Sequence, residues 1–244
     1  MEVSDVKSKA LRELYEKGVR VLGESESRKV LEEYGIPCPK TVAIGYEEGK
    51  KAEEYLRELK SSSEWPGYPL FLKIVSPDII HKSDAGVVKR VASDDEALMA
   101  IETIIKNAKK YKAGVRINGI LASQDVSSPE TRELLIGAVY NEHFGHLISL
   151  GIGGVLTEVY KDVEFRAIPI TESDVYSMVS RLKGRAMLGP FRGMRSINMN
   201  VLVDVVLKFS KMIEENPEIR EIDINPFIIG PERGFAVDSR MRVE

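Results

Sequence analysis

A lysine lies within an otherwise apolar stretch, LFLKIVS, at residues 70–76. Because side chains alternate along a strand, Lys73 shares one face with Phe71 and Val75. A charged side chain between apolar neighbours costs free energy unless it reaches solvent or an anion. Two interpretations follow: Lys73 faces outward from an edge strand, or it points into a cleft and binds a phosphate.

A polar loop, SPDIIHKSDAG, follows this stretch and contains His81 beside Lys82 and Asp84. A histidine in such a loop is commonly a solvated surface residue. A neutral imidazole can also accept a phosphoryl group near pH 7. A flexible loop that contains glycine and lies near a phosphate-binding lysine would suit that second role, and both interpretations stay open.

Three oxygen-bearing side chains occur near the C-terminal end of the sequence. In EIDINPF, Asp223 and Asn225 are two residues apart, so a strand places both on one face. Asp238 lies in the following strand-like stretch, FAVDS. Carboxylate and amide oxygens from adjacent strands suit Mg²⁺ that is held together with nucleotide phosphates. The alternative is structural, with Asn225 starting a turn before Pro226 and Asp238 capping a strand.

Other motifs point away from zinc and dinucleotide binding. His143 and His146 have the spacing of metal ligands, but no further Cys or His lies nearby, and a hairpin turn is expected there. Cys38 is the single cysteine, which excludes an internal disulfide and a multi-cysteine metal site. The glycines of GIGGV, residues 151–155, do not fit the dinucleotide fingerprint, because its third glycine position is Leu156.

The composition excludes several classes of protein. The 244 residues include 35 Lys and Arg and 38 Asp and Glu, without the basic excess that a nucleic-acid-binding surface needs. Hydrophobic residues make up 43%, too many for disorder, and no apolar run approaches 18 residues. The first residues, MEVSDVKSKA, lack the apolar core of a signal peptide. We therefore expect a globular, cytoplasmic protein that binds neither nucleic acid nor membrane.

Helical spacing of apolar residues predicts helices along much of the chain. They are expected at residues 8–22, 25–35, 47–60, 93–108, 172–182 and 201–213. After a turn at AGVRING, four strand-like runs follow without helices between them, namely GILASQDV, ELLIGAVY, HLISLGI and VEFRAIPI. Consecutive strands of this kind predict one antiparallel meander sheet.

The change from helix-covered strands to a meander predicts two lobes that meet near residues 114–119. We expect a small lobe over residues 24–117 and a C-terminal lobe over residues 118–244. The helix within residues 1–23 is expected to pack on the C-terminal lobe.

Taken together, these motifs resemble one known family. The lysine strand with its loop (LKIVSPDIIHKSDAGVV), the hinge strand ILASQDV, ELLIG, GIGGVLTEVYKDVEFRAIP and EIDINPF are similar to the ATP-grasp subunit of NDP-forming acyl-CoA synthetases. The similarity is greatest to the β subunits of ADP-forming acetyl-CoA synthetases, and it covers residues 24–238. It implies an α/β (α+β) ATP-grasp fold, with two lobes sandwiching a nucleotide.

The resemblance also implies a reaction in which acyl-CoA, ADP and phosphate yield acid, ATP and CoA. An acyl phosphate forms on a partner α subunit, and its phosphoryl group passes to a histidine of that subunit and is carried to ADP in the ATP-grasp site. His81 is implied as a histidine that relays this group, with Asp223 supporting the phosphohistidine. Asn225 and Asp238 are implied as Mg²⁺ ligands.

The contacts with ADP or ATP that the resemblance implies come from six residues: Lys73, Gln124, Asp125, Val126, Glu133 and Arg166. Lys73 and Arg166 would face the phosphates, and the three hinge residues would line the pocket for adenine and ribose. Glu133 would bind ribose or orient a lysine. Relatives often carry glutamate at position 125, and Asp125 is shorter than glutamate by one methylene group.

The resemblance finally implies a partner. The sequence lacks recognisable CoA-binding and acyl-phosphate-forming domains, so we expect an α subunit that carries them, in an α₂β₂ assembly. Two rival functions remain open. One is a stand-alone ATP-grasp ligase that joins a carboxylate to an amine, which gives His81 no role. The other is a non-catalytic, nucleotide-binding regulatory subunit.

Overall fold

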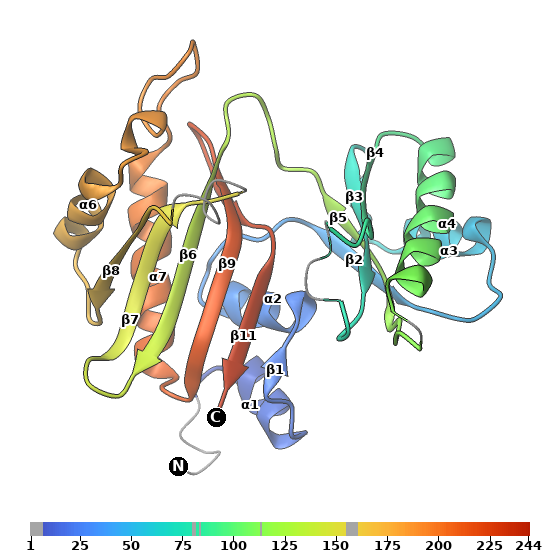
Figure 1. The fold of residues 1–244 in the computed structure, drawn as a ribbon, viewed down its shortest axis with the longest axis horizontal. Helices are drawn as coiled ribbons and strands as arrows, with labels where there is room; N and C mark the ends of the chain where they lie inside the picture. Colours follow the sequence, from blue (N-terminus) through green and yellow to red (C-terminus); the bar gives the residue numbers. More distant parts are fainter. Residues whose placement is uncertain (1–6, 80–81, 83, 113, 155–160) are drawn as a thin grey trace. The chain divides into compact units, whose positions relative to one another are not determined.

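The computed structural model describes residues 7–79, 82, 84–112, 114–154 and 161–244. The chain forms two compact units, one made of Pro39–Val126 and the other of Met1–Cys38 together with Ser127–Glu244. Each unit has its own sheet and its own hydrophobic core (Figure 1). The smaller unit is therefore inserted, along the sequence, between two parts of the larger one.

The smaller unit is a four-stranded antiparallel sheet covered by two helices (Figure 1). Its strands, in the order β2-β5-β3-β4, span Thr41–Gly45, Gly119–Gln124, Leu70–Val75 and Val88–Val91. The helices are α3 (Ala52–Ser61) and α4 (Asp94–Tyr111).

Alternation along β3 decides which face the helices cover. Leu70, Leu72 and Ile74 are buried in one core with apolar residues of α3 and α4. Helix α4 begins at the predicted cap, where Ser93 Oγ accepts a hydrogen bond of 3.3 Å from the Glu96 N–H. The opposite face of the sheet, which carries Phe71 and Lys73, is not covered by α3 or α4.

The larger unit is built on a seven-stranded antiparallel sheet of order β1-β11-β9-β6-β7-β8, with β10 paired to β9. In that order, the strands span Val21–Leu22, Ser239–Val243, Ile219–Ile229, Arg132–Asn141, Gly145–Ile152 and Val163–Ala167, and β10 spans Gly234–Ala236. The helices α1, α2, α6 and α7 span Lys9–Glu16, Glu24–Glu33, Glu172–Arg181 and Met199–Glu215, and a short 3₁₀ helix, η2, spans Arg185–Met187.

One face of this larger sheet is buried under helices. Val206 and Phe209 of α7 are fully buried in one cluster with Ile136, Ile148 and Ile224 of the sheet. Figure 1 shows α7 running along the sheet behind β6 and β7. The residues that alternate with this core therefore lie on the face that these helices do not cover.

Two predicted elements are wrong. The helix expected over residues 8–22 ends at Glu16, because Gly18 takes a φ of +76° and Val21–Leu22 pair with β11. Strand β5 was expected in the meander, but it pairs with β2 and β3 in the smaller sheet. The remaining meander of β6, β7 and β8 is confirmed.

The boundaries of the two units differ from the expected lobe boundaries, because burial of α2 and pairing of β5 decide which residues belong to each unit. Val30 and Leu31 of α2 are buried in the larger core, so residues 24–38 belong with the C-terminal half rather than with the small lobe. Pairing of β5 extends the smaller unit to Val126. Within the described ranges, none of the helices combines the length and hydropathy that spanning a bilayer requires.

Candidate functional site

The uncovered face of β9 carries two of the predicted residues. Asp223 and Asn225 are exposed and alternate with Ile222 and Ile224, which are buried in the core. A one-residue slip of β9 would expose both isoleucines and bury the polar pair, so the core fixes the register. The predicted placement of Asp223 and Asn225 on one face is confirmed.

Asp238 lies directly across from Asn225, in the connection between β10 and β11. The Asn225 N–H donates to the Asp238 carbonyl oxygen at 3.0 Å, and the next cross-strand pair is Ile224 with Ser239. Side chains directly opposite one another in an antiparallel pair point to the same side. The structure therefore brings Asp223, Asn225 and Asp238 together on one face.

The electrostatics of this group centre on Asp223. Desolvation on the sheet raises the pKa of its carboxyl group, and the carboxylates of Asp238 and Glu221 raise it further. Arg240, opposite Asp223 on β11, lowers the pKa. The carboxylates repel one another, so a bound cation would stabilise this face.

Gly137 belongs to the same face and was missed by the sequence reasoning. It lies between Asp223 on β9 and Ser149 on β7. A Cβ at this position would lie only 2.7 Å from Ser149 Oγ and 3.2 Å from the Ile222 carbonyl oxygen. The glycine thus keeps the sheet open beside Asp223. The available signal was a glycine inside the apolar strand ELLIG, which indicates close approach of another group.

The donor set suits Mg²⁺. Asn225 and Asp238 offer amide and carboxylate oxygens, and Mg²⁺ is commonly bound by one or two carboxylates together with substrate phosphates. In the part of the chain that the structure describes, no group of three or more His, Cys, Asp or Glu is placed to hold a metal ion by itself. With Mg²⁺ bound, nucleotide phosphates and water would complete the coordination. His146 is engaged elsewhere, with Nε2 2.7 Å from the Ile219 carbonyl oxygen.

Glu133 begins the same open face on β6 and is exposed. Two glycines of GIGGV, Gly153 and Gly154, pack closely against it. The Gly153 N–H donates to the Glu133 carbonyl oxygen at 2.7 Å, and a Cβ at Gly154 would overlap the Glu133 carboxylate. These glycines permit a close approach of two backbone segments, which explains their clustering without a dinucleotide site.

Arg166 does not join this group. It lies opposite Ile148 on β7, on the helix-covered side, and donates from its guanidinium to Ser177 Oγ of α6 at 3.1 Å. Alternation along β8 instead puts the exposed Phe165 on the face of Asp223. The structure thus separates Arg166 from the oxygen ligands that the resemblance grouped with it.

Lys73 lies on the face of the smaller sheet that is opposite to α3 and α4. Strand β3 has partners on both sides, and Lys73 is only 5% exposed, with Leu121 and Val88 as cross-strand neighbours. The outward-facing edge lysine is therefore the wrong interpretation. Ser123 is buried on the same face, and its Oγ has no hydrogen-bond partner among the described residues. This face carries a cation and a hydroxyl group that suit an anionic ligand.

The hinge residues have partners within their own unit. The Gln124 side chain accepts a hydrogen bond from the Lys40 N–H at 3.3 Å. The Asp125 carboxylate is 2% exposed and receives Arg90 Nε at 2.6 Å. Val126 is half-buried at the end of the unit. The nucleotide contacts of these residues stay a prediction, and Arg90 is a cation that the sequence reasoning did not single out.

His81 lies outside the described residues, but the structure describes the anchors on either side of it. Upstream, Asp78 accepts hydrogen bonds from the Arg116 backbone N–H and guanidinium at 2.9–3.2 Å, which lowers the pKa of Asp78 to about 2. Downstream, Asn107 Nδ2 of α4 donates to the Gly86 carbonyl oxygen at 2.8 Å. Both ends of the connection are therefore fixed to the smaller unit.

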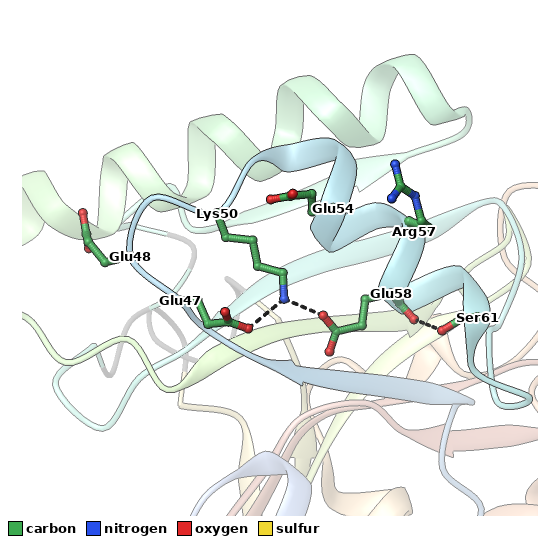
Figure 2. Close-up of a pocket in the computed structure, with 7 residues that line it drawn as sticks. All are labelled: Glu47, Glu48, Lys50, Glu54, Arg57, Glu58 and Ser61. Atoms are coloured by element: carbon green, nitrogen blue, oxygen red, sulfur yellow. Dashed lines mark hydrogen bonds and ion pairs between the residues drawn. The ribbon is translucent and has the colours of Figure 1, made fainter.

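A hollow of about 540 Å³ on the outer side of α3 does not suit a nucleotide. Figure 2 shows Lys50 paired with Glu47 at 2.9 Å and with Glu58 at 2.6 Å, and Glu54 projecting nearby. Its lining is Glu47, Glu48, Lys50, Glu54, Arg57, Glu58 and Ser61. A mainly acidic lining repels phosphates, so we take the uncovered face of each sheet, considered by itself, as the candidate for nucleotide contacts.

A family model for the ATP-grasp domain matches residues 13–243, which include every residue of both sheet faces described above. The chain belongs to the ATP-grasp family. The resemblance inferred from the sequence motifs and the α/β fold that it implied are both confirmed.

Among curated ATP-grasp relatives, two proteins of Pyrococcus furiosus match nearly the whole chain. The β subunit of acetate–CoA ligase (ADP-forming) I is 39% identical, over 94% of this chain and 96% of the relative. The β subunit of acetate–CoA ligase (ADP-forming) II is 35% identical, over 96% of each. Both relatives are named as β subunits of an ADP-forming acetate–CoA ligase.

Solved structures show a similarity to the same class of enzyme. An acetyl-coenzyme A synthetase 1 from Ca. Korarchaeum cryptofilum, in complex with coenzyme A and Ca-AMPCP, is 34% identical with a TM-score of 0.84, covering 96% of this chain and 98% of that one. A second structure of that synthetase, with Mg-AMPPCP, is 32% identical with a TM-score of 0.77 and covers both chains fully. Its phosphohistidine segment points towards the nucleotide binding site.

Proposed function

We propose that this chain is the nucleotide-binding β subunit of an ADP-forming acyl-CoA synthetase that acts on acetyl-CoA. The overall reaction converts acyl-CoA, ADP and phosphate to acid, ATP and CoA. The match to two β subunits over nearly the full length of each supports this proposal. The bound Mg-AMPPCP and the phosphohistidine segment of a related structure support the chemistry.

The observation that carries the proposal is the pairing of Asn225 with Asp238. Their main chains are joined by the 3.0 Å hydrogen bond, and Asp223 lies beside them on the same uncovered face. We infer that Asn225 and Asp238 hold Mg²⁺ together with nucleotide phosphates. When bound, Mg²⁺ would supply positive charge next to the phosphate oxygens.

The remaining roles belong to side chains of this protein. Lys73 donates charge-assisted hydrogen bonds to phosphate oxygens of ADP. Asp223 accepts a hydrogen bond from the imidazole of a phosphohistidine and so orients it. His81 relays the phosphoryl group: its nitrogen–phosphorus bond breaks as a bond forms between phosphorus and an oxygen of the ADP β-phosphate.

The name β subunit implies a partner subunit, and we infer an α subunit that supplies the CoA site and forms the acyl phosphate. Two copies of each chain in an α₂β₂ assembly, and a cytoplasmic location, stay predictions. In this proposal the acyl phosphate forms on the α subunit and ATP forms on this chain, so the phosphoryl carrier must reach a site on each subunit.

Reconstitution tests this proposal. The purified chain should bind Mg-ADP but make no ATP from acetyl-CoA and phosphate until the α subunit is added. Label from γ-³²P-ATP should appear on protein as an acid-labile, base-stable phosphoimidazole. ATP-dependent joining of a carboxylate to an amine by the isolated chain would support the stand-alone ligase instead. Nucleotide binding without labelled histidine or restored activity would support the regulatory subunit.

A further inference from the structure

The segment between α6 and α7 has an unusual charge pattern for this chain. From Val175 to Val203 there are five basic residues and no aspartate or glutamate, although acidic residues outnumber basic ones overall. The basic residues are Arg181, Lys183, Arg185, Arg192 and Arg195. Figure 1 shows the orange connection before α7 extending past the end of the larger sheet.

A buried carboxylate fixes the first part of this segment. Asp162 is 8% exposed, and its two oxygens accept hydrogen bonds of 2.8 Å from the backbone N–H groups of Lys183 and Gly184. A Cβ at Gly184 would lie 2.9 Å from an Ile152 side-chain carbon, so the backbone is held close to the sheet. The side chain of Lys183 is left exposed.

A buried arginine fixes the second part. Arg132 is 7% exposed, and its guanidinium donates to the carbonyl oxygens of Met187 at 2.9 Å, Gly189 at 3.3 Å and Arg195 at 2.8 Å. It also donates to the Glu130 carbonyl oxygen. Such contacts hold the connection in one conformation without using the side chains at its tip.

The tip itself is a tight turn with an unfavourable residue. Phe191 and Met194 exchange two backbone hydrogen bonds of 3.2 and 2.9 Å, and the residues between them, Arg192 and Gly193, have φ values of 47° and 83°. Positive φ at both central positions defines a type I′ turn, which favours Asn, Asp or Gly. Arginine is strained there, and strained residues cluster where function requires the side chain.

The turn displays an exposed cation beside apolar groups. The Arg192 guanidinium carbon lies 5.5 Å from the centre of the Phe191 ring, and residues 190–196 line a shallow hollow of about 550 Å³. Arg195 is paired with Glu130 at 2.7 Å, and the other four basic residues, Arg181, Lys183, Arg185 and Arg192, are exposed. A cation at the edge of an apolar hollow is typical of protein interfaces, where Arg and aromatic residues are enriched.

We propose that this turn docks on a carboxylate-rich surface of the α subunit, with Arg192 as its central contact. The proposal rests on the proposed function, because it takes the partner to be the α subunit. The charge pattern selects an acidic partner, and the buried Asp162 and Arg132 provide the rigidity that limits the entropy lost on binding. The strain at position 192 is then explained by the need for a guanidinium at the tip.

Arg192→Gly separates this role from a structural one. Glycine relieves the strain at positive φ, so the melting temperature should stay the same or rise. The affinity for the α subunit, measured by biolayer interferometry, should fall at least about tenfold through the loss of a charged contact. Arg192→Glu should weaken binding further, and the difference from the unaltered chain should shrink at high salt.

Lys161→Gly is the matched control. Lys161 is also an exposed cation with positive φ, 46°, in the same unit, so its replacement by glycine likewise removes one positive charge and relieves the strain of positive φ. It should leave α-subunit affinity unchanged. If the Arg192 variants and the unaltered chain bound the α subunit with equal affinity, the inference would be overturned. It would also be overturned if the Arg192 variants lost only binding to tRNA or to anionic vesicles. Failure of the unaltered chain to bind the α subunit would instead count against the proposed function.

Discussion

Asp238→Asn is the most informative single change to the oxygen-ligand group. The hydrogen bond between Asn225 and residue 238 uses backbone atoms only, so the substitution preserves it. Asp238 is partly buried, and asparagine has nearly the same size and shape as aspartate, so the substitution opens no cavity and introduces no overlap. We therefore expect the variant to fold like the unaltered chain.

Binding of Mg-ADP should be affected far more than stability. The variant loses one anionic oxygen, and a charge-assisted contact contributes roughly 1.5–3 kcal/mol. This corresponds to about a ten- to hundredfold loss of affinity. Raising Mg²⁺, or replacing it with Mn²⁺, should restore part of the loss, because the amide oxygen of the new side chain remains a weak ligand.

The same substitution should change the pH dependence of stability. The pKa of Asp223 is raised by desolvation and by the carboxylates of Asp238 and Glu221. A carboxyl group with a raised folded-state pKa favours folding most below its unfolded pKa of about 3.9 and loses that contribution as pH rises through the folded value. Because Asp238→Asn removes one cause of the shift, the variant should lose less stability between pH 4 and pH 7.

Isothermal titration with Mg-ADP and thermal melting across this pH range measure both effects. Asp204→Asn is the control, since it removes an exposed carboxylate of α7 that pairs with Lys208 at 2.6 Å, a contact of about 0.3–0.5 kcal/mol. A loss of ADP affinity that does not respond to Mg²⁺ or Mn²⁺ would refute metal ligation. An unchanged pH profile would refute the coupling of Asp238 to Asp223.

Three further changes test the other residues. Lys73→Met should lower ADP affinity about ten- to hundredfold, because it removes a charge-assisted hydrogen bond to phosphate. Calorimetry and urea unfolding decide this, and a large loss of stability with normal ADP affinity would show a structural lysine. His81→Asn should retain ADP binding and abolish ATP formation with the α subunit, and full activity would exclude the relay. Asp125→Asn should lower the free energy of unfolding by roughly 1–3 kcal/mol, because Arg90 loses its partner at 2.6 Å. Normal stability in urea with weakened ADP binding would instead make Asp125 a nucleotide contact.

The sequence alone determined features that depend on local periodicity. The spacing of Asp223 and Asn225 is enough to put both on one face, because a strand has a period of two wherever it pairs. The Ser93 cap and the apolar stripe of α7 were equally readable, since caps and helical stripes are set by residues within a few turns. The family could be inferred because its motifs are short, contiguous stretches.

Strand pairing was decided by the tertiary structure. GILASQDV has the same local pattern as the strands after it, yet β5 completes the smaller sheet between β2 and β3. Val21–Leu22 continue a helical pattern, yet they pair with β11 at the far end of the sequence. Local pattern does not distinguish these outcomes, because the stabilising partners are far away along the chain.

The tertiary structure also decided which residues lie together in the candidate site. The register of β11 puts Asp238 opposite Asn225, and the register of β6 puts Gly137 beside Asp223. Alternation along β8 puts Phe165, not Arg166, on that face, because the partner of Arg166 on β7 is the core residue Ile148. Which residues of separate strands meet is set by how the strands bury their apolar sides, and that depends on the whole core rather than on any one motif.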